Sequence, residues 1–102
     1  MLVRLFPAAE SDFADIVDYY SNVSSSLSER FISELDLSLN RLIASPSMGS
    51  PRYAHFLPDR SLRVWQLKHF PFLIFYRLDH GTLAVLRVLH ERRALAPEMI
   101  SV

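Results

Sequence analysis

Apolar residues that recur every three or four positions predict two helices in the first half of the chain. In residues 7–22, PAAESDFADIVDYYSN, four apolar side chains fall at positions i, i+3, i+4 and i+7 of one helical face. The same spacing continues over residues 26–45 for more than four turns. The two stripes consist of Phe13, Ile16, Val17 and Tyr20, and of Leu27, Phe31, Ile32, Leu35, Leu39, Leu42 and Ile43.

Polar residues and prolines mark where these helices begin and end. Pro7 suits a first helical turn, and the acidic residues at positions 10, 12 and 15 complement the positive end of the helix dipole. Ser26 and Glu29 form a capping-box pattern at the start of the second helix, and Pro46 marks its end. Because the helices are separated only by residues 22–26, NVSSS, they are expected to form an antiparallel hairpin.

Apolar segments elsewhere predict strands. A short one covers residues 2–6, and longer ones cover residues 62–70, 71–79 and 82–90. The last two are joined by Asp79-His80-Gly81, which is typical of a hairpin turn. Both faces of the segment 82–90 are mostly apolar, so it is expected to be a central strand. Residues 46–61, which contain three of the six prolines, are expected to form an irregular crossing.

The order β-α-α-β-β-β predicts an α+β fold and one domain over residues 1–102. We expect an N-terminal strand, then the antiparallel two-helix hairpin, then a three-stranded antiparallel sheet with the hairpin packed on one of its faces. The other face of the sheet is expected to be partly uncovered and open to a partner or substrate.

Composition narrows the class of protein. Half of the residues are hydrophobic and there is no cysteine, which excludes disulfides and thiolate metal sites. No apolar run approaches the roughly 20 residues that span a bilayer, and residues 1–13 lack the layout of a secretory signal, so a cytoplasmic location is expected. Residues 1–50 carry a net charge of −4 and residues 51–102 a net charge of +4. The second half is therefore a candidate for binding an anionic partner, although the zero total disfavours strong binding of nucleic acid.

Three arginines alternate with apolar neighbours on three successive predicted strands: Arg63, Arg77 and Arg87. Adjacent strands lie about 5 Å apart, so these side chains would form one cationic stripe if their registers agree. Alternatively, each pairs separately with Asp59, Asp79 or Glu91.

The last strand ends in His90-Glu91-Arg92-Arg93, a cluster of charge and imidazole. His90 is either an acid or base in an anionic site or a strand-end residue that bonds the adjacent loop. Arg92 and Arg93 either anchor an acidic partner or form a solvated strand end.

Other polar residues show no pattern of a metal or cofactor site. The histidines at positions 55, 69, 80 and 90 lack ligand spacing, so neither a metal nor a cofactor is expected. The acidic residues of the helices are expected on their outer, solvated faces; they are Asp15, Asp18, Glu34 and Asp36.

The chain resembles the RelE/ParE toxin superfamily of bacterial type II toxin-antitoxin modules, and its ParE branch in particular. The similarity covers about residues 2–95 and is most specific in LIASPSMG, FPFLIFYR and VLRVLHERR. It implies a toxin without a reaction of its own that inhibits DNA gyrase, is neutralised by a cognate antitoxin and meets DNA only through the antitoxin or gyrase. No contact with a membrane is implied. The residues expected to contact the target are Arg63, Arg77, Arg87, His90, Arg92 and Arg93.

Two alternatives remain within the superfamily. A RelE-type ribosome-dependent mRNA endoribonuclease would use Arg63, Arg87, His90 and Arg92 on RNA. However, Leu73 and Trp65 stand where such enzymes often have basic residues, and residues 94–102 contain no tyrosine, histidine or basic residue. The other alternative is a non-toxic, degenerate member that only binds antitoxin.

The aromatic residues of the second half, among them Trp65, Phe70 and Phe72, are interpreted as core and protein interface. An antitoxin is expected to lay a helix or strand across them.

Overall fold

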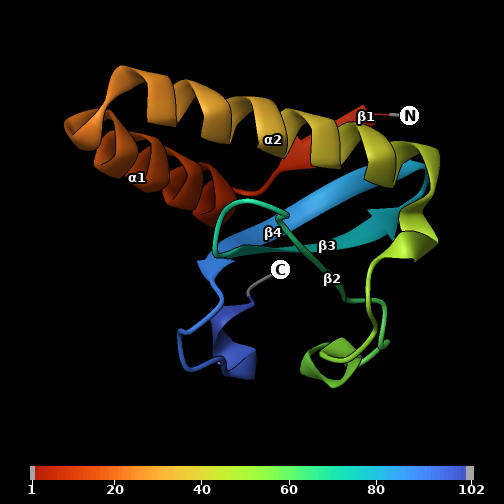
Figure 1. The fold of residues 1–102 in the computed structure, drawn as a ribbon. Coiled ribbons are helices and arrows are strands. Elements are labelled where there is room, and N and C mark those ends of the chain that lie inside the picture. The colour runs from red at the N-terminus through yellow and green to blue at the C-terminus, as the bar shows by residue number, and fades with distance from the viewer. Residues whose placement is uncertain (1, 101–102) are drawn as a thin grey trace.

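The computed structural model describes residues 2–100, which form a sheet between a helical layer and a layer of loops (Figure 1). The helices are antiparallel neighbours and lie on one side of the sheet, as predicted. The elements are β1 (Leu2–Leu5), α1 (Pro7–Val23), α2 (Ser25–Ala44), β2 (Arg63–Gln66), β3 (Phe72–Asp79) and β4 (Thr82–His90). This order confirms the α+β fold.

The sheet has four strands in the order β1-β4-β3-β2, so β4 is central, as predicted. Strand β2 pairs antiparallel with β3, and β3 pairs antiparallel with β4. Strand β1 adds a fourth, parallel strand beside β4, from the pair Leu2–Thr82 to the pair Leu5–Val85. The expected three-stranded antiparallel sheet is therefore part of a mixed four-stranded sheet. The helical hairpin carries the chain from β1 at one edge of the sheet to β2 at the other edge.

The hairpin turn between β3 and β4 consists of two residues with positive φ, His80 at 46° and Gly81 at 82°. Positive φ at both central positions is the signature of a type I′ turn, whose twist matches that of the flanking strands. The predicted turn is confirmed.

The start of α2 differs from the prediction. Ser24 has extended backbone and its Oγ accepts a hydrogen bond from the Leu27 N–H at 3.1 Å, so it caps the helix in place of Ser26. Ser24, Ser25 and Ser26 are consecutive, and any of them could cap the helix with its hydroxyl group, so the sequence does not distinguish between them. Ser24 takes the role because it alone separates the two helices.

The first strand of the antiparallel part is also shorter than predicted. Strand β2 ends at Gln66, not at residue 70. Leu67 and Phe70 then turn inward and are buried in the core beneath the helices.

Both faces of the sheet are covered by apolar clusters. The cluster beneath the helices includes Phe31, Leu42, Ile74 and Val85. The opposite cluster is closed by side chains of the 46–61 crossing and the C-terminal segment; these are Tyr53, Phe56, Leu57, Leu95, Met99 and Ile100. The prediction of a partly uncovered sheet face is therefore wrong, because irregular segments provide the second layer.

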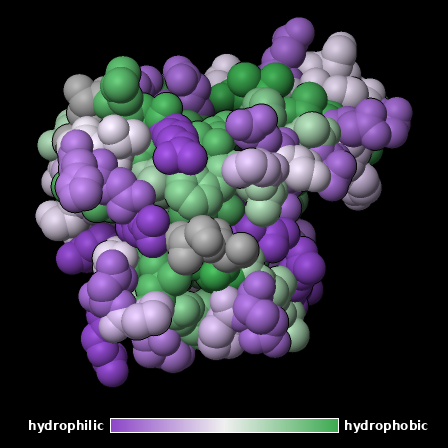
Figure 2. Space-filling model, turned by 180° about the vertical axis from the view of Figure 1, so that it is seen from behind, coloured by the Kyte–Doolittle hydropathy of each residue, from purple (hydrophilic) through white to green (hydrophobic). Residues whose placement is uncertain are grey.

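None of the helices within residues 2–100 is long and apolar enough to cross a membrane. The face of the molecule seen from behind in Figure 2 shows apolar residues in its middle and hydrophilic residues around them.

A buried tyrosine fixes the start of the 46–61 crossing to the sheet. Tyr76 is inaccessible to solvent, and its hydroxyl donates to the Pro46 carbonyl at 2.6 Å and accepts from the Gly49 N–H at 2.9 Å. Burial raises the pKa of Tyr76 above its ordinary value, although the Gly49 N–H and the charge of Arg63 act in the opposite direction. The Arg63 guanidinium holds the same segment by donating to the carbonyls of Ser47 and Gly49, at 3.2 and 2.7 Å.

We predict that Gly49→Ala destabilises the fold through this contact. The backbone at Gly49, with φ −66° and ψ 156°, is accessible to alanine, but its Cβ would lie 2.3 Å from the Tyr76 hydroxyl oxygen. Overpacking and the loss of the two hydrogen bonds should lower the free energy of unfolding by about 2–4 kcal/mol, measured by urea denaturation. Ser47, a nearby exposed residue, provides a control, since Ser47→Ala should change the free energy of unfolding by less than about 0.5 kcal/mol. Equal stability of Gly49→Ala and the parent chain would show that the tyrosine contact is dispensable.

Candidate functional site

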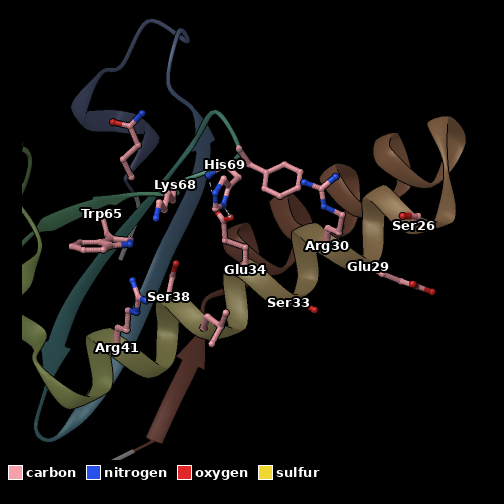
Figure 3. A pocket seen from close by; sticks show the side chains of 13 residues that line it. Ser26, Glu29, Arg30, Ser33, Glu34, Ser38, Arg41, Trp65, Lys68 and His69 are labelled. Carbon is pink, nitrogen blue, oxygen red and sulfur yellow. Dashed lines mark hydrogen bonds and ion pairs between the residues drawn. The ribbon is translucent and has the colours of Figure 1, made fainter.

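A groove of about 650 Å³ lies between α2 and the strand at the sheet edge, β2. Figure 3 shows side chains of the two elements facing each other across it. The α2 wall is a stripe at helical spacing, and the opposite wall comes from β2 and the residues after it. The α2 wall contains Ser26, Glu29, Arg30, Ser33, Glu34, Leu37, Ser38 and Arg41, and the opposite wall contains Trp65, Gln66, Lys68, His69 and Phe70.

The groove combines apolar surface with positive charge. Leu37 is 60% exposed, and Trp65 is partly exposed on the opposite wall. Three cations, Arg30, Arg41 and Lys68, line the same groove, and they outnumber its two carboxylates, Glu29 and Glu34. Such a surface is complementary to an amphipathic segment that carries acidic side chains.

The groove wall is held together by a contact between α2 and the β2–β3 connection. Glu34 accepts a hydrogen bond from the His69 backbone N–H at 2.9 Å, and its other oxygen lies 2.6 Å from His69 Nδ1. Glu34 was predicted on a solvated helix face, but its side chain is 14% exposed, so that prediction is wrong. Burial alone would raise the pKa of Glu34; the hydrogen bonds and charge of His69 outweigh it and hold the pKa below its ordinary value.

The three arginines of the predicted stripe have separate partners. Arg63 pairs across β2 and β3 with Tyr76 and points to the carbonyls described above. Arg77 lies 2.8 Å from Asp79, one of the acidic partners considered from the sequence. Because Arg63 lies opposite Tyr76, the chain neighbour of Arg77, Arg63 and Arg77 are on opposite faces of the sheet. Arg87 lies opposite Phe75, next to a bulge in the β3–β4 ladder, and so occupies a third row. The registers therefore do not produce one stripe of these three residues.

Arg87 is the centre of a network that joins α1, β4 and the C-terminal segment. Its Nε and one terminal nitrogen donate to the two carboxylate oxygens of Asp12 at 2.7 and 2.8 Å, and its other terminal nitrogen donates to the Met99 carbonyl at 3.0 Å. Asp12 also accepts from the Val88 N–H at 3.0 Å. The hydrogen bonds to Asp12 raise the pKa of Arg87 further, against the opposing effect of burial. This arginine is thus engaged within the chain.

The residues at the end of β4 are the accessible part of the predicted target contact. His90, Arg92 and Arg93 are exposed. His90 Nδ1 accepts a hydrogen bond from the Arg92 N–H at 3.1 Å, and its ring packs edge-on against Phe72. His90 therefore bonds the adjacent loop, while the two arginine side chains extend from the rim.

The four residues of the ribonuclease alternative do not converge. Arg63 lies opposite Tyr76, whereas His90 lies opposite Phe72, four residues away on β3 and therefore about 13 Å along the strand. Arg63 and Arg87 are both bound to other parts of the chain. The four residues therefore do not form the single set that this alternative predicts.

The aromatic residues predicted to bind an antitoxin have different environments. Phe70 is 7% exposed and packs edge-on against Phe31 and Tyr20 in the core. Phe72 is partly buried against Phe31, whereas Trp65 lines the groove.

Asp15, Asp18 and Asp36 are exposed on the helices, as predicted. Within residues 2–100, no three histidine or acidic side chains are grouped so that they could hold a metal ion.

Comparison with known proteins identifies relatives of this chain. The model of a family described as ParE toxin of type II toxin-antitoxin system, parDE, matches residues 3–95. A solved structure described as "Chromosomal ParDE TA system from P. aeruginosa" is similar in fold, with a TM-score of 0.71 and 19% sequence identity over 88% of this chain and 95% of that chain. The curated protein sequences gave no match.

We predict that the Glu34–His69 contact makes stability depend on pH. A lowered folded-state pKa means that the contribution of Glu34 is fully present above the ordinary glutamate pKa and is lost as pH falls through the folded-state value. Glu34→Gln should therefore lower the free energy of unfolding at neutral pH and have little effect in acid, measured by urea denaturation at a series of pH values. Glu29→Gln, at an exposed position five residues earlier on α2, is the control. A loss of stability in Glu34→Gln that is the same at every pH would contradict the assignment.

Proposed function

The chain belongs to the ParE toxin family of type II toxin-antitoxin systems, and from this premise we propose that it inhibits DNA gyrase by direct contact and is neutralised by an antitoxin bound in the α2–β2 groove. The solved structure of similar fold is that of a ParDE toxin-antitoxin system, which supports an antitoxin as the partner.

The observation that carries the antitoxin assignment is the composition of the groove. An exposed leucine and a partly exposed tryptophan, Leu37 and Trp65, lie among three cations. An occupant would bury the apolar side chains and would need acidic groups opposite Arg30, Arg41 and Lys68. An amphipathic acidic helix or strand of the antitoxin has these properties.

The gyrase assignment is supported by the distribution of the arginines. Arg63 and Arg87 are engaged within the chain, so they are poor candidates for a site of chemistry. Arg92 and Arg93 extend from the end of β4 and are free to meet an acidic protein surface or DNA phosphate. Inhibition by binding needs only such a contact surface.

The purified chain, tested with gyrase, ATP and supercoiled plasmid, should inhibit supercoiling and accumulate linear plasmid. Charge reversal of the rim in an Arg92→Glu, Arg93→Glu double variant should weaken this inhibition by about tenfold or more, since it replaces attraction by repulsion. The matched control is Arg52→Glu, Arg60→Glu, which reverses two exposed cations of the 46–61 crossing. Unaffected gyrase at micromolar chain, together with mRNA cleavage on programmed ribosomes, would contradict the proposal in favour of the ribonuclease.

The second arm of the experiment adds the antitoxin encoded beside the chain and measures recovery of supercoiling. Leu37→Arg should retain inhibition but require about tenfold more antitoxin for rescue, because it places a charge where an apolar contact is proposed. Val23→Arg is a matched control, since Val23 is 64% exposed on α1, outside the groove. Equal rescue of the two variants would exclude the groove as the antitoxin site.

A further inference from the structure

A second cavity, of about 450 Å³, lies on the face of the sheet opposite the helices, near the β3–β4 turn. Its lining contains two arginines from non-adjacent strands, Arg4 of β1 and Arg77 of β3. Because these residues are far apart in the sequence, only the fold brings them together. The complete lining is Arg4, Arg77, Asp79, His80, Thr82 and Ala84.

Strand register places the two arginines in one row. Arg4 pairs with Ala84 across β1 and β4, and Arg77 pairs with the same Ala84 across β3 and β4. Residues paired in this way share a face of the sheet, so the two arginines stand about 10 Å apart at their Cα atoms with a small side chain between them. The alanine leaves space that a larger residue would fill.

The two guanidinium groups also converge on one aromatic ring. The Arg4 guanidinium carbon lies 4.9 Å from the centroid of the Phe6 ring, and that of Arg77 lies 6.0 Å from the same centroid. Two like charges held near one ring repel each other unless negative charge compensates them. The fold therefore concentrates positive charge at this cavity.

Only part of that charge is compensated by the chain. Arg77 Nε is 2.8 Å from Asp79 Oδ1, but it is buried and is not aligned for a hydrogen bond with any atom of the described chain. For Arg4, the described residues provide no carboxylate within ion-pair distance. Asp79 is thus the one carboxylate of the described residues within ion-pair distance of either arginine, while Asp59 interacts with Arg77 from beyond that distance. A buried donor of Arg77 remains without a hydrogen bond.

We propose that this cavity is a binding site for a phosphate group, held between Arg4 and Arg77. Guanidinium groups present parallel N–H donors that match phosphate oxygens. The Thr82 side chain offers a hydroxyl donor on the same row as Asp79, and the imidazole of His80 lies at the turn that closes the cavity. The phosphate belongs either to a small anion or to a nucleic acid backbone. The site is separate from the groove and from the rim arginines, so it does not depend on the proposed function.

The test is an NMR titration of the arginine Nε–H signals of the full chain with inorganic phosphate, at ionic strength kept constant with chloride. The signals of Arg4 and Arg77 should shift and saturate, and Arg4→Gln should weaken binding by about tenfold, as expected for the loss of a charge-assisted contact. Arg4 is exposed, so this variant should fold; its Arg77 signal reports on the site directly.

The matched control is Arg52→Gln, which removes another exposed arginine that lies over an aromatic ring, 5.1 Å from the Tyr53 centroid, without a second arginine in the same row. It should leave phosphate binding unchanged. A second titration with a short oligothymidylate distinguishes the sources: tighter binding than phosphate identifies a nucleic acid backbone, and equal or weaker binding identifies a small anion. Shifts that do not saturate, or that are equally weakened by Arg4→Gln and Arg52→Gln, would overturn the proposal.

Discussion

The carboxylate of Asp12 accepts a backbone hydrogen bond from β4 at a point where no neighbouring strand does so. Strand β1 accompanies β4 only as far as Val85, where the Phe6 N–H makes the last hydrogen bond of the pair at 2.9 Å. Beyond that point the Val88 N–H would have no backbone partner, and Asp12 accepts its hydrogen bond instead. Arg87 binds the same carboxylate and also the Met99 carbonyl. These hydrogen bonds join α1, the central strand β4 and the C-terminal segment that covers the second face of the sheet.

This constraint separates the arginines by role. Two strand arginines hold irregular segments: Arg63 holds the segment after α2, and Arg87 holds the C-terminal segment. A largely buried guanidinium needs such partners, because an unpaired buried charge is strongly unfavourable. The arginines available for recognition therefore lie at the margins, in the groove, at the end of β4 and beside β1.

The parts of the fold that depend on periodicity could be predicted from the sequence. The helical stripe containing Phe31 and Leu42 and the two apolar faces of β4 imply the helices, the central strand and the α+β class. The parallel addition of β1 and the cover of the second sheet face could not be predicted, because irregular segments such as residues 46–61 carry no periodic signal. The close contact between Gly49 and Tyr76 could not be predicted either, because these two residues are brought together only by the fold.

The candidate sites were less predictable because they depend on long-range register. Arg63, Arg77 and Arg87 alternate alike in the sequence, yet the strand register places Arg63 opposite Tyr76, on the other face of the sheet from Arg77. A bulge between Phe75 and Tyr76 then sets the position of Arg87. Glu34 was expected on a solvated helix face and Asp12 was interpreted as a complement to the helix dipole, since nothing local shows that His69 or Val88 lies against them. Arg4 and Arg77 share a row only because β1 pairs with β4.

Arg87 maintains the fold, while Arg92 and Arg93 at the end of β4 are exposed and available for contact. A double-mutant cycle of Asp12→Asn and Arg87→Gln, measured by urea unfolding, tests the role of Arg87 most directly. Because the two side chains form a largely buried pair, we expect a coupling free energy of about 2–4 kcal/mol between the two positions. We also expect a change of less than about 0.5 kcal/mol for Arg92→Ala, an exposed residue. A coupling near zero, with Arg87→Gln as stable as the parent chain, would show that Arg87 does not maintain the fold and would make it a candidate contact residue again.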